Sequence, residues 1–326
     1  MNNPSFKPSM NLKTAQQRAV ILQQIRQFFA DKNILEVETP LLCSGTVTDV
    51  YLEAFECYYK YSKVTLSPVK LYLQTSPEFS LKRLLASGYG DIFQLCKAFR
   101  HEECGRHHNA EFTLLEWYRL GFDHLQLMDE VAELLTLIFN CDGVDKITYQ
   151  QLFIDHVAID PLLASKNDLI ATLNTHNKLS DWLLKETGKD ILLQVILAEI
   201  IEPKIGKTRP CFIYEFPSSQ ASLAKISQTN PMVAERFECY YQGIELVNGF
   251  HELTDAKEQL TRFNRDNELR RDKGLVERPI DNNFIAALEA GLPDCSGVAL
   301  GIDRLVMLAC NASHIDEVIT FNINKA

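Results

Sequence analysis

The sequence predicts an α+β fold with an antiparallel β-sheet that is flanked by helices. Two observations support this class. Strand-like segments at 91–99 and 111–118 are joined by a polar loop, 101–110, which indicates a long antiparallel hairpin. The helical segments are clustered along the chain, whereas a doubly wound parallel sheet would need strands and helices in regular alternation.

The remaining elements of the N-terminal third follow from periodicity and from start and stop signals. Thr14 can cap a helix, and Pro77 suits a first helical turn because its missing N–H needs no partner there. These elements are a helix over 14–31, a strand over 34–40 that ends at a proline, a strand over 71–75 and a helix over 77–87.

Residues 123–205 are mostly helical in pattern, with breaks near 142–143, 160–161 and 188. We interpret them as a helical insertion within a single catalytic domain that covers residues 1–326. The predicted elements after the insertion are strands over 211–216, 236–241 and 243–249, helices over 255–272 and 282–290, and a last strand and helix over 297–310.

Composition narrows the function classes. The net charge is −10, so a wide surface for nucleic-acid phosphates is not expected. The sequence has no apolar signal core and no apolar run long enough to span a membrane. The nine cysteines are dispersed and never spaced C-x-x-C, which is typical of a reducing compartment. We therefore expect a cytoplasmic protein without stable nucleic-acid binding.

Two short patterns point to functions that their surroundings do not favour. Cys104 lies near His107 and His108, but no second cysteine or histidine group follows at zinc-like spacing. Residues 206–208, Gly-Lys-Thr, end like a phosphate-binding loop, yet the required earlier glycine would fall at Ile201. A solvated turn is the better interpretation of the second pattern.

Two arginines in unusual settings predict a surface that binds a nucleoside triphosphate. Arg100 lies in Phe-Arg-His-Glu at 99–102, and Arg304 ends Gly-Val-Ala-Leu-Gly-Ile-Asp-Arg at 297–304. A planar guanidinium can neutralise phosphate through two hydrogen bonds, and it can also stack on a purine. Either arginine alone is weak support, because such residues usually lie on solvated faces.

Three glutamates recur at a spacing of seven residues: Glu238, Glu245 and Glu252. If the first two lie on neighbouring strands across the turn at 242–243, their carboxylates can converge. Hard oxygen ligands of this kind hold Mg²⁺ together with substrate phosphates. Exposed glutamates alternating along an amphipathic hairpin would give the same pattern, and the pattern alone does not separate the two interpretations.

Four segments carry a resemblance to a known family. Residues 35–40, 99–116 and 297–304 resemble the three signature motifs of class II aminoacyl-tRNA synthetases, and 238–252 resembles the lysyl member of that class. The likeness covers essentially the whole chain and leaves no room for an anticodon-binding barrel before the first helix. A free-standing lysyl-type domain of this length is similar to the elongation factor P–(R)-β-lysine ligase family.

The resemblance implies an ATP-dependent, AMP-forming ligase with Mg²⁺. It would activate (R)-β-lysine as an aminoacyl-adenylate and transfer it to a lysine side chain of elongation factor P. Residues 35–40 and the preceding helix form the dimer interface throughout this class, so the resemblance also implies a homodimer.

The resemblance assigns roles to individual residues. It places Arg100 and Arg304 as catalytic residues and Glu238 and Glu245 as Mg²⁺ ligands. The implied ATP-binding residues are Arg100, His101, Glu102, His108, Asn109, Phe112, Glu245, Leu246, Gly301 and Arg304. The implied amino-acid-binding residues are Ser76, Pro77, Glu78, Glu116, Tyr118, Asn248, Phe250 and Glu252.

Three alternatives remain open on sequence grounds. A lysyl-tRNA synthetase-like enzyme would charge tRNA, which the acidic composition disfavours. An ammonia-dependent asparagine synthetase-like enzyme would bind aspartate, which an acidic pocket would repel. A non-catalytic amino-acid sensor would have no need of every phosphate and metal contact.

Overall fold

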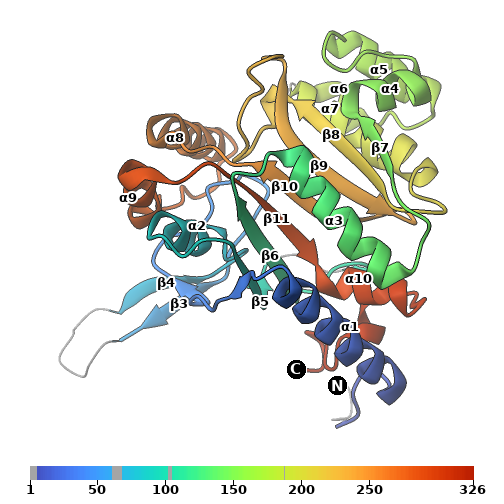
Figure 1. The fold of residues 1–326 in the computed structure, drawn as a ribbon. Coiled ribbons are helices and arrows are strands. Elements are labelled where there is room, and N and C mark those ends of the chain that lie inside the picture. The colour runs from blue at the N-terminus through green and yellow to red at the C-terminus, as the bar shows by residue number, and fades with distance from the viewer. Residues whose placement is uncertain (1–5, 61–67, 102–104, 187) are drawn as a thin grey trace. The chain divides into compact units, whose positions relative to one another are not determined.

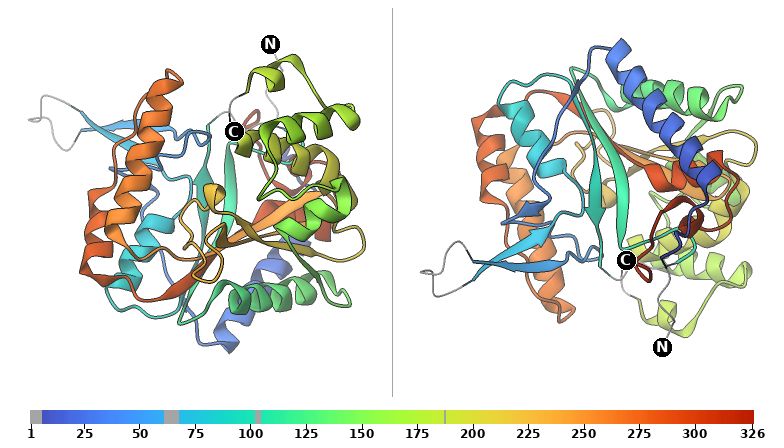
Figure 2. Two further views of the ribbon diagram at one scale, coloured as in Figure 1. Left: turned by 90° about the horizontal axis from the view of Figure 1, so that it is seen from above. Right: turned by 90° about the horizontal axis from the view of Figure 1, so that it is seen from below.

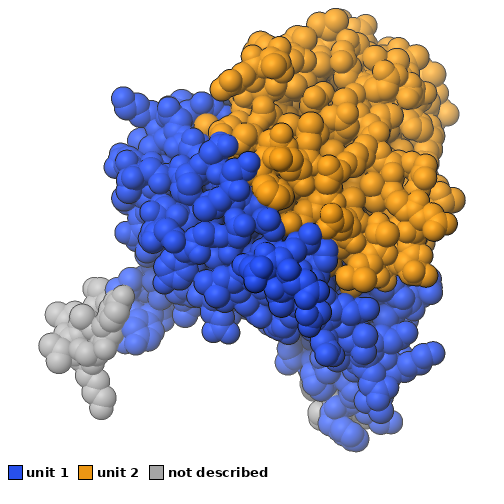
Figure 3. Space-filling model, viewed as in Figure 1, with its two compact units in different colours: residues 1–121, 254–295, 299–326 blue, residues 122–253, 296–298 orange. Residues whose placement is uncertain are grey.

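The computed structural model describes residues 6–60, 68–101, 105–186 and 188–326. Glu102 and Cys104, both considered above, lie outside the described residues. The chain forms two compact units, coloured separately in Figure 3. The first comprises residues 1–121, 254–295 and 299–326, and the second comprises residues 122–253 and 296–298. The assignment of the whole chain to one catalytic domain stays a prediction.

The strands form one sheet of eight strands, in the order β1-β5-β6-β11-β10-β9-β8-β7, and one of three, in the order β2-β4-β3. Their bounds are β1 Leu35–Glu36, β2 Leu42–Cys43, β3 Glu56–Tyr59, β4 Val69–Leu73, β5 Ile92–Phe99, β6 Glu111–Leu120, β7 Asp145–Thr148, β8 Cys211–Pro217, β9 Val233–Tyr241, β10 Ile244–His251 and β11 Cys295–Gly301. The predicted α+β class is confirmed.

The large sheet is antiparallel over its central strands, as expected, and it is mixed because the pairing is parallel at its two edges. Strand β1 pairs with β5 in parallel, and β7 pairs with β8 in parallel. In each case the chain passes through other elements, among them helices, before it returns to the sheet, which allows parallel pairing. The predicted hairpin is confirmed, with β5 and β6 in antiparallel register from Ile92↔Tyr118 to Phe99↔Glu111.

The helices are α1 Leu12–Asp31, α2 Glu78–Ala86, α3 His124–Phe139, α4 Tyr149–Val157, α5 Lys166–Thr175, α6 Asp181–Lys185, α7 Lys189–Ile196, α8 Ala256–Asp272, α9 Asn282–Gly291 and α10 Ile302–Ala309. Short helical turns follow at Leu197–Ile201, Glu202–Lys204, Ser218–Gln220 and Ile315–Val318. No helix of the described ranges is both long enough and apolar enough to cross a bilayer.

In the first unit, α1 packs on the β5–β6 hairpin through aromatic side chains. The ring of Phe29 stacks on Phe93 with centroids 4.3 Å apart, and it also meets Trp117. The α1 cap is Asn11, whose side chain accepts a hydrogen bond from the Thr14 backbone N–H, so the prediction of Thr14 as the cap was wrong. An asparagine carbonyl oxygen fills this role as well as a hydroxyl does.

Two other predicted elements of this unit differ from the observed ones at their ends. The predicted strand over 34–40 is ordered as a strand only at Leu35–Glu36, because its pairing with β5 stops there and Pro40 lacks a backbone donor. Helix α2 begins at Glu78, one residue later than expected, with Pro77 at the cap position. Figure 2 shows α2, α8 and α9 lying together, and Phe79 of α2 stacks on Phe284 of α9.

In the second unit, β8, β9 and β10 are antiparallel neighbours, and α3 packs on β9 and β10 (Figure 1). The mostly helical pattern over 123–205 is confirmed, but strand β7 was not expected. It is an edge strand of four residues that pairs with β8, and so short a strand shows little periodicity in its sequence. An apolar core between the helices and β8 includes Phe153, Leu193 and Ile213.

Candidate active site

Arg100 follows β5 directly and faces an aromatic ring on β6. Its guanidinium carbon lies 5.1 Å from the centroid of the Phe112 ring, within the range of a cation–π contact. The Arg100 backbone N–H donates to the Ala110 carbonyl, which extends the hairpin pairing by one step. The first predicted arginine and the predicted adenine-stacking ring are therefore neighbours on one hairpin.

Arg304 lies in the first turn of α10 and contacts the loop of the same hairpin. Its Nε donates to the His107 carbonyl oxygen at 3.2 Å, and its Nη2 lies 2.6 Å from His108 Nε2. Because a guanidinium only donates, His108 Nε2 accepts and carries no proton there. The structure thus brings together Arg304 and His108, both predicted to lie at the nucleotide.

The residue before Arg304 anchors α10 to two other elements. Asp303 is 2% exposed. Its carboxylate forms an ion pair with Arg18 of α1 at 2.7 Å and accepts the backbone N–H of Thr113 on β6, also at 2.7 Å. These contacts hold the start of α10 against α1 and β6, and they therefore fix the position of Arg304.

Asn109 and His101 have mainly structural contacts. The Asn109 side-chain amide donates to the Glu111 carbonyl and accepts from the Ile323 backbone N–H. His101 packs beside the Phe55 ring. Asn109 is 5% exposed, so it ties the hairpin loop to the C-terminal segment, and its predicted place at the nucleotide stays a prediction.

A buried carboxyl lies between α2 and the hairpin. Glu116 is 3% exposed and accepts hydrogen bonds from Ser76 Oγ at 2.6 Å and from Tyr118 OH at 2.8 Å. Burial, reinforced by the nearby charge of Glu78, raises the pKa of Glu116 to about 8. Four predicted amino-acid-binding residues are therefore neighbours, with Pro77 beside them in the chain.

Glu78 has a cationic partner of its own. Its carboxylate accepts from Lys82 Nζ at 2.6 Å, one helical turn later, and Lys82 is fully buried. Lys82 also lies over the Phe284 ring. Because Lys82 neutralises Glu78, an incoming ammonium would gain more from an ionised Glu116 than from Glu78. The resemblance had suggested Glu78 and Glu252 for the two amines and Glu116 near the backbone-type groups, and these roles stay predictions.

In the second unit, a β-bulge decides which side chains share a face. Glu245 lies opposite Tyr240, whereas Asn248 lies opposite Glu238, so the register shifts between Glu245 and Val247. Residues three apart in a regular strand point to opposite faces. The extra residue of the bulge reverses this, and it places Glu245 and Asn248 on the same face of β10.

That face carries a connected polar network centred on Arg236. Its guanidinium forms an ion pair with Glu238, bonds Asn248 Oδ1 at 3.3 Å and lies over the Phe250 ring. The other Glu238 oxygen accepts from Tyr240 OH at 2.5 Å. Burial and the charges of Glu238 and Glu245 raise the pKa of Tyr240, so its hydroxyl remains a donor.

Arg236 and Tyr240 were not predicted as site residues. The signal was present in the sequence, since Arg236, Glu238 and Tyr240 alternate along one strand and so share a face. Glu252 follows β10, pairs through its backbone with Ala224 and is 1% exposed. Leu246, predicted at the nucleotide, is buried at the bulge.

Close packing explains why position 249, between the predicted substrate-binding residues Asn248 and Phe250, is a glycine. It lies opposite Phe237 across β9 and β10. A Cβ at Gly249 would come within 2.4 Å of the Phe237 ring. Any larger residue would therefore displace Phe237 or distort the strand that carries Asn248 and Phe250.

The Glu238 and Glu245 side chains fit a divalent cation in their chemistry. Both share a face with Tyr240, and both offer hard oxygen atoms. Each Glu238 oxygen accepts one hydrogen bond, from Arg236 or from Tyr240, and a carboxylate oxygen has a second lone pair for a metal. Their role as ligands stays a prediction.

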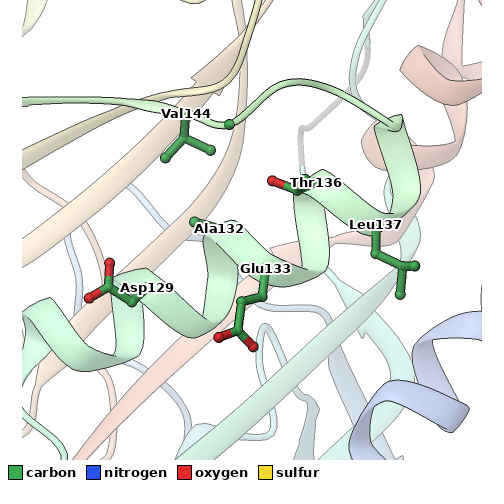
Figure 4. Close-up of a pocket in the computed structure, with 7 residues that line it drawn as sticks. Asp129, Ala132, Glu133, Thr136, Leu137 and Val144 are labelled. Atoms are coloured by element: carbon green, nitrogen blue, oxygen red, sulfur yellow. The ribbon is translucent and has the colours of Figure 1, made fainter.

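A shallow hollow elsewhere in the second unit contains none of the predicted residues. It is lined by α3 and the segment that follows it, with Ala132, Leu137 and Val144 giving it a partly apolar surface (Figure 4). Its polar lining comes from Asp129, Glu133 and Thr136, none of which belongs to the groups described above, so we do not assign the hollow to catalysis.

Comparison with known proteins shows the family to which these motif segments belong. The profile of the tRNA synthetases class II (D, K and N) matches residues 6–325. A protein of Salmonella gallinarum named elongation factor P–(R)-β-lysine ligase is 52% identical over 99% of this chain and 98% of its own. This chain belongs to the elongation factor P–(R)-β-lysine ligase family of class II tRNA synthetase-like proteins. Ligases of the same name from Vibrio cholerae and Klebsiella pneumoniae are 51% and 52% identical, over 100% and 99% of this chain and 100% and 98% of their own.

Membership of this family accounts for both the fold and the motif segments. In this member of the β-lysine ligase family, the hairpin with Arg100 and Phe112, and α10 with Arg304, belong to the first unit. The bulged strand pair with Glu238 and Glu245 belongs to the second unit. The resemblance stated from the sequence is therefore confirmed.

Proposed function

We propose that this chain activates (R)-β-lysine with ATP and joins it to a lysine side chain of elongation factor P. The observation that carries the proposal is identity of 51–52% to ligases of that name over essentially their whole length. The buried, hydrogen-bonded carboxyl of Glu116 supports a substrate that carries ammonium groups.

The reaction has two steps and no covalent enzyme intermediate. The carboxylate oxygen of β-lysine attacks the α-phosphorus of ATP, and the bond to pyrophosphate breaks. The acceptor amine of elongation factor P then attacks the carbonyl carbon of the adenylate, forms an amide and releases AMP. Phosphoryl transfer depends mainly on positioning and charge stabilisation, which arginines supply.

The nucleotide roles fall to the arginines of the first unit. We assign Arg100 to the α-phosphate, where negative charge must be held while the bond to pyrophosphate breaks. Phe112 would stack on adenine with Arg304 on the other side, and His108 would lie toward the terminal phosphates. The contact of Arg304 with His108 supports their acting together.

Mg²⁺ would be held by Glu238 and Glu245, and it would neutralise phosphate charge when bound. Arg236 and Tyr240 position Glu238 by occupying one lone pair of each oxygen. This arrangement fixes the direction of the carboxylate, as hydrogen bonds to metal-ligating carboxylates do in general.

Selectivity for a diamine would come from buried acidic side chains. Glu116 in the first unit and Glu252 in the second are 3% and 1% exposed. An ammonium about 4 Å from a carboxylate gains roughly 4 kcal/mol at an effective dielectric constant near 20, before desolvation is subtracted. We therefore propose that each of these carboxyls binds an ammonium group, and that Asn248 and Phe250 contact the carbon chain.

We also propose a cytoplasmic homodimer. Leu12, Val20 and Leu35, on α1 and β1, are 75%, 55% and 51% exposed, which suits a surface covered by a second copy. The cysteines of the described ranges are free thiols, as is usual in a reducing compartment. Sedimentation velocity of the wild type and of Leu35→Asp tests the dimer, since the charged residue should shift the population toward monomer.

The function is tested by ATP–pyrophosphate exchange with (R)-β-lysine, α-lysine and aspartate in turn, followed by mass analysis of elongation factor P. We expect exchange with β-lysine and a mass increase on one lysine of elongation factor P. Charging of tRNA with α-lysine and an unmodified factor would favour the synthetase alternative. Exchange with aspartate, or binding without exchange, would favour the other two alternatives.

A further inference from the structure

A second polar cluster lies on the other face of β9 and β10. Glu235 is three residues before Glu238 in β9, and His251 is three residues after Asn248 in β10, so both point away from the network of Arg236. Helix α3 packs on these strands and begins with His124. The cluster therefore belongs to a part of the molecule that the proposed reaction does not use.

The three side chains are close enough to share one ligand. One atom from each of His124, Glu235 and His251 lies within 4.8 Å of the other two. His251 Nδ1 and Glu235 Oε2 are already 2.5 Å apart. Two imidazole nitrogens and one carboxylate oxygen form a common ligand set for zinc and related divalent ions.

His124 supplies an independent sign that a partner is missing. It is 8% exposed, and neither of its ring nitrogens has a hydrogen-bond partner among the residues that the structure describes. Burial of an unsatisfied polar group normally costs free energy. Burial also lowers the pKa of His124, which keeps a lone pair available on the neutral ring.

The charge around the cluster favours a cation. Burial raises the pKa of the Glu215 carboxyl, and the negative charge of nearby Glu235 raises it further. Asp123 precedes His124 and acts on it electrostatically. Lys225 is the opposing group, with its Nζ 3.0 Å from His251 Nε2.

We propose that His124, Glu235 and His251 form a binding site for a divalent transition-metal ion of the zinc type. A water molecule would occupy the fourth coordination position of the ion. Lys225 competes with the ion for the His251 imidazole, so its ammonium must move away when the metal binds. The site joins the start of α3 to β9 and β10, so the bound ion stabilises the second unit.

The test is equilibrium dialysis of the full-length, EDTA-treated protein against Zn²⁺, with metal content measured by mass spectrometry. We expect one equivalent to bind to the wild type. His124→Gln and His251→Gln should each weaken binding by about tenfold or more, as expected for loss of a ligand. Lys225→Met should tighten it, and His176→Gln, outside the cluster, should leave it unchanged.

Absorption after substitution with Co²⁺ identifies the ligands. We expect bands of a nitrogen and oxygen ligand set without thiolate charge transfer, and they should be lost in His124→Gln. Circular dichroism shows whether each variant is folded, and Lys225→Met tests the site without removing a ligand. Absence of binding to the wild type, unchanged binding in both histidine variants, or thiolate bands would each overturn the proposal.

Discussion

Glu238 lies directly opposite Asn248 across β9 and β10, because a bulge between Glu245 and Val247 shifts the register by one residue. Arg236 connects the two, through an ion pair to Glu238 and a hydrogen bond to Asn248. The proposed metal ligand and the proposed substrate contact are thus held by one guanidinium. A change at either residue should affect the other through Arg236.

Asn248→Ala removes one acceptor from Arg236 and one proposed contact of the substrate chain. We expect kcat/KM for β-lysine in pyrophosphate exchange to fall about tenfold, as for loss of one hydrogen bond of roughly 1.4 kcal/mol. Asn174→Ala on the exposed face of α5 is the control. A variant with wild-type kcat/KM would remove Asn248 from the substrate contacts.

Glu252→Gln keeps the size of the side chain and removes its charge. We expect (R)-β-lysine to bind between about tenfold and a hundredfold more weakly, because a charge-assisted hydrogen bond contributes roughly 1.5–3 kcal/mol. ATP affinity should be retained. Calorimetric titration with each ligand measures both, with the exposed Glu199→Gln as control. Intact β-lysine affinity would show that Glu252 does not contact an ammonium group.

The raised pKa of Glu116 predicts a pH dependence of stability. Its pKa is about 8 in the folded protein against an ordinary 4.5, so the folded state binds more protons between these values. The stabilising contribution is complete below pH 4.5 and is lost as the pH rises toward 8. Glu116→Gln should flatten this part of the pH dependence of the free energy of unfolding, measured with urea, whereas exposed Glu289→Gln should not.

The same carboxyl predicts proton release on substrate binding. A bound ammonium favours the ionised form, so β-lysine should displace a proton from Glu116 at pH 7. The binding enthalpy in buffers of different ionisation enthalpy measures the number of protons released. Equal enthalpies in all buffers, for the wild type, would argue that Glu116 is already ionised or lies away from the amines.

Arg100→Ala removes the charge that we assign to the α-phosphate and also the contact with Phe112. The rate of adenylate formation should fall about a hundredfold, corresponding to roughly 3 kcal/mol of transition-state stabilisation. Arg271→Ala, which breaks an exposed ion pair with Glu277, is the control. Single-turnover measurement separates this loss from slower product release, and an unchanged rate of the chemical step would exclude the assignment.

Asp303→Asn tests how α10 is held. Removing the charge leaves Arg18 without its buried partner, and breaking such a pair costs roughly 3–5 kcal/mol. We expect a loss of about 3 kcal/mol in the free energy of unfolding. Asp129→Asn breaks a pair with Lys146 at an exposed position and should change stability by less than about 0.5 kcal/mol. Similar losses for the two variants would mean that Asp303 is not a special anchor.

The sequence alone determined the elements with strong local signals. The β5–β6 hairpin, helices α1, α8 and α9 and the helical region between α3 and β8 follow from side-chain periodicity and from capping and turn residues. The motif segments around Arg100 and Arg304 are also local patterns, and they were sufficient to indicate the family. These features depend on residues close together in the chain, so a single sequence contains them.

Tertiary packing decided what depends on distant residues. The parallel direction of β1 and β7 depends on the path of the chain between strands, and the bulge that aligns Asn248 with Glu238 depends on how β10 packs against β9. The pair of Glu78 and Lys82 lies within one helix, but the burial of Glu116 beside Ser76 needs the start of α2 to lie against the hairpin. Burial and electrostatic partners are properties of the folded protein, because side chains distant in the sequence create them.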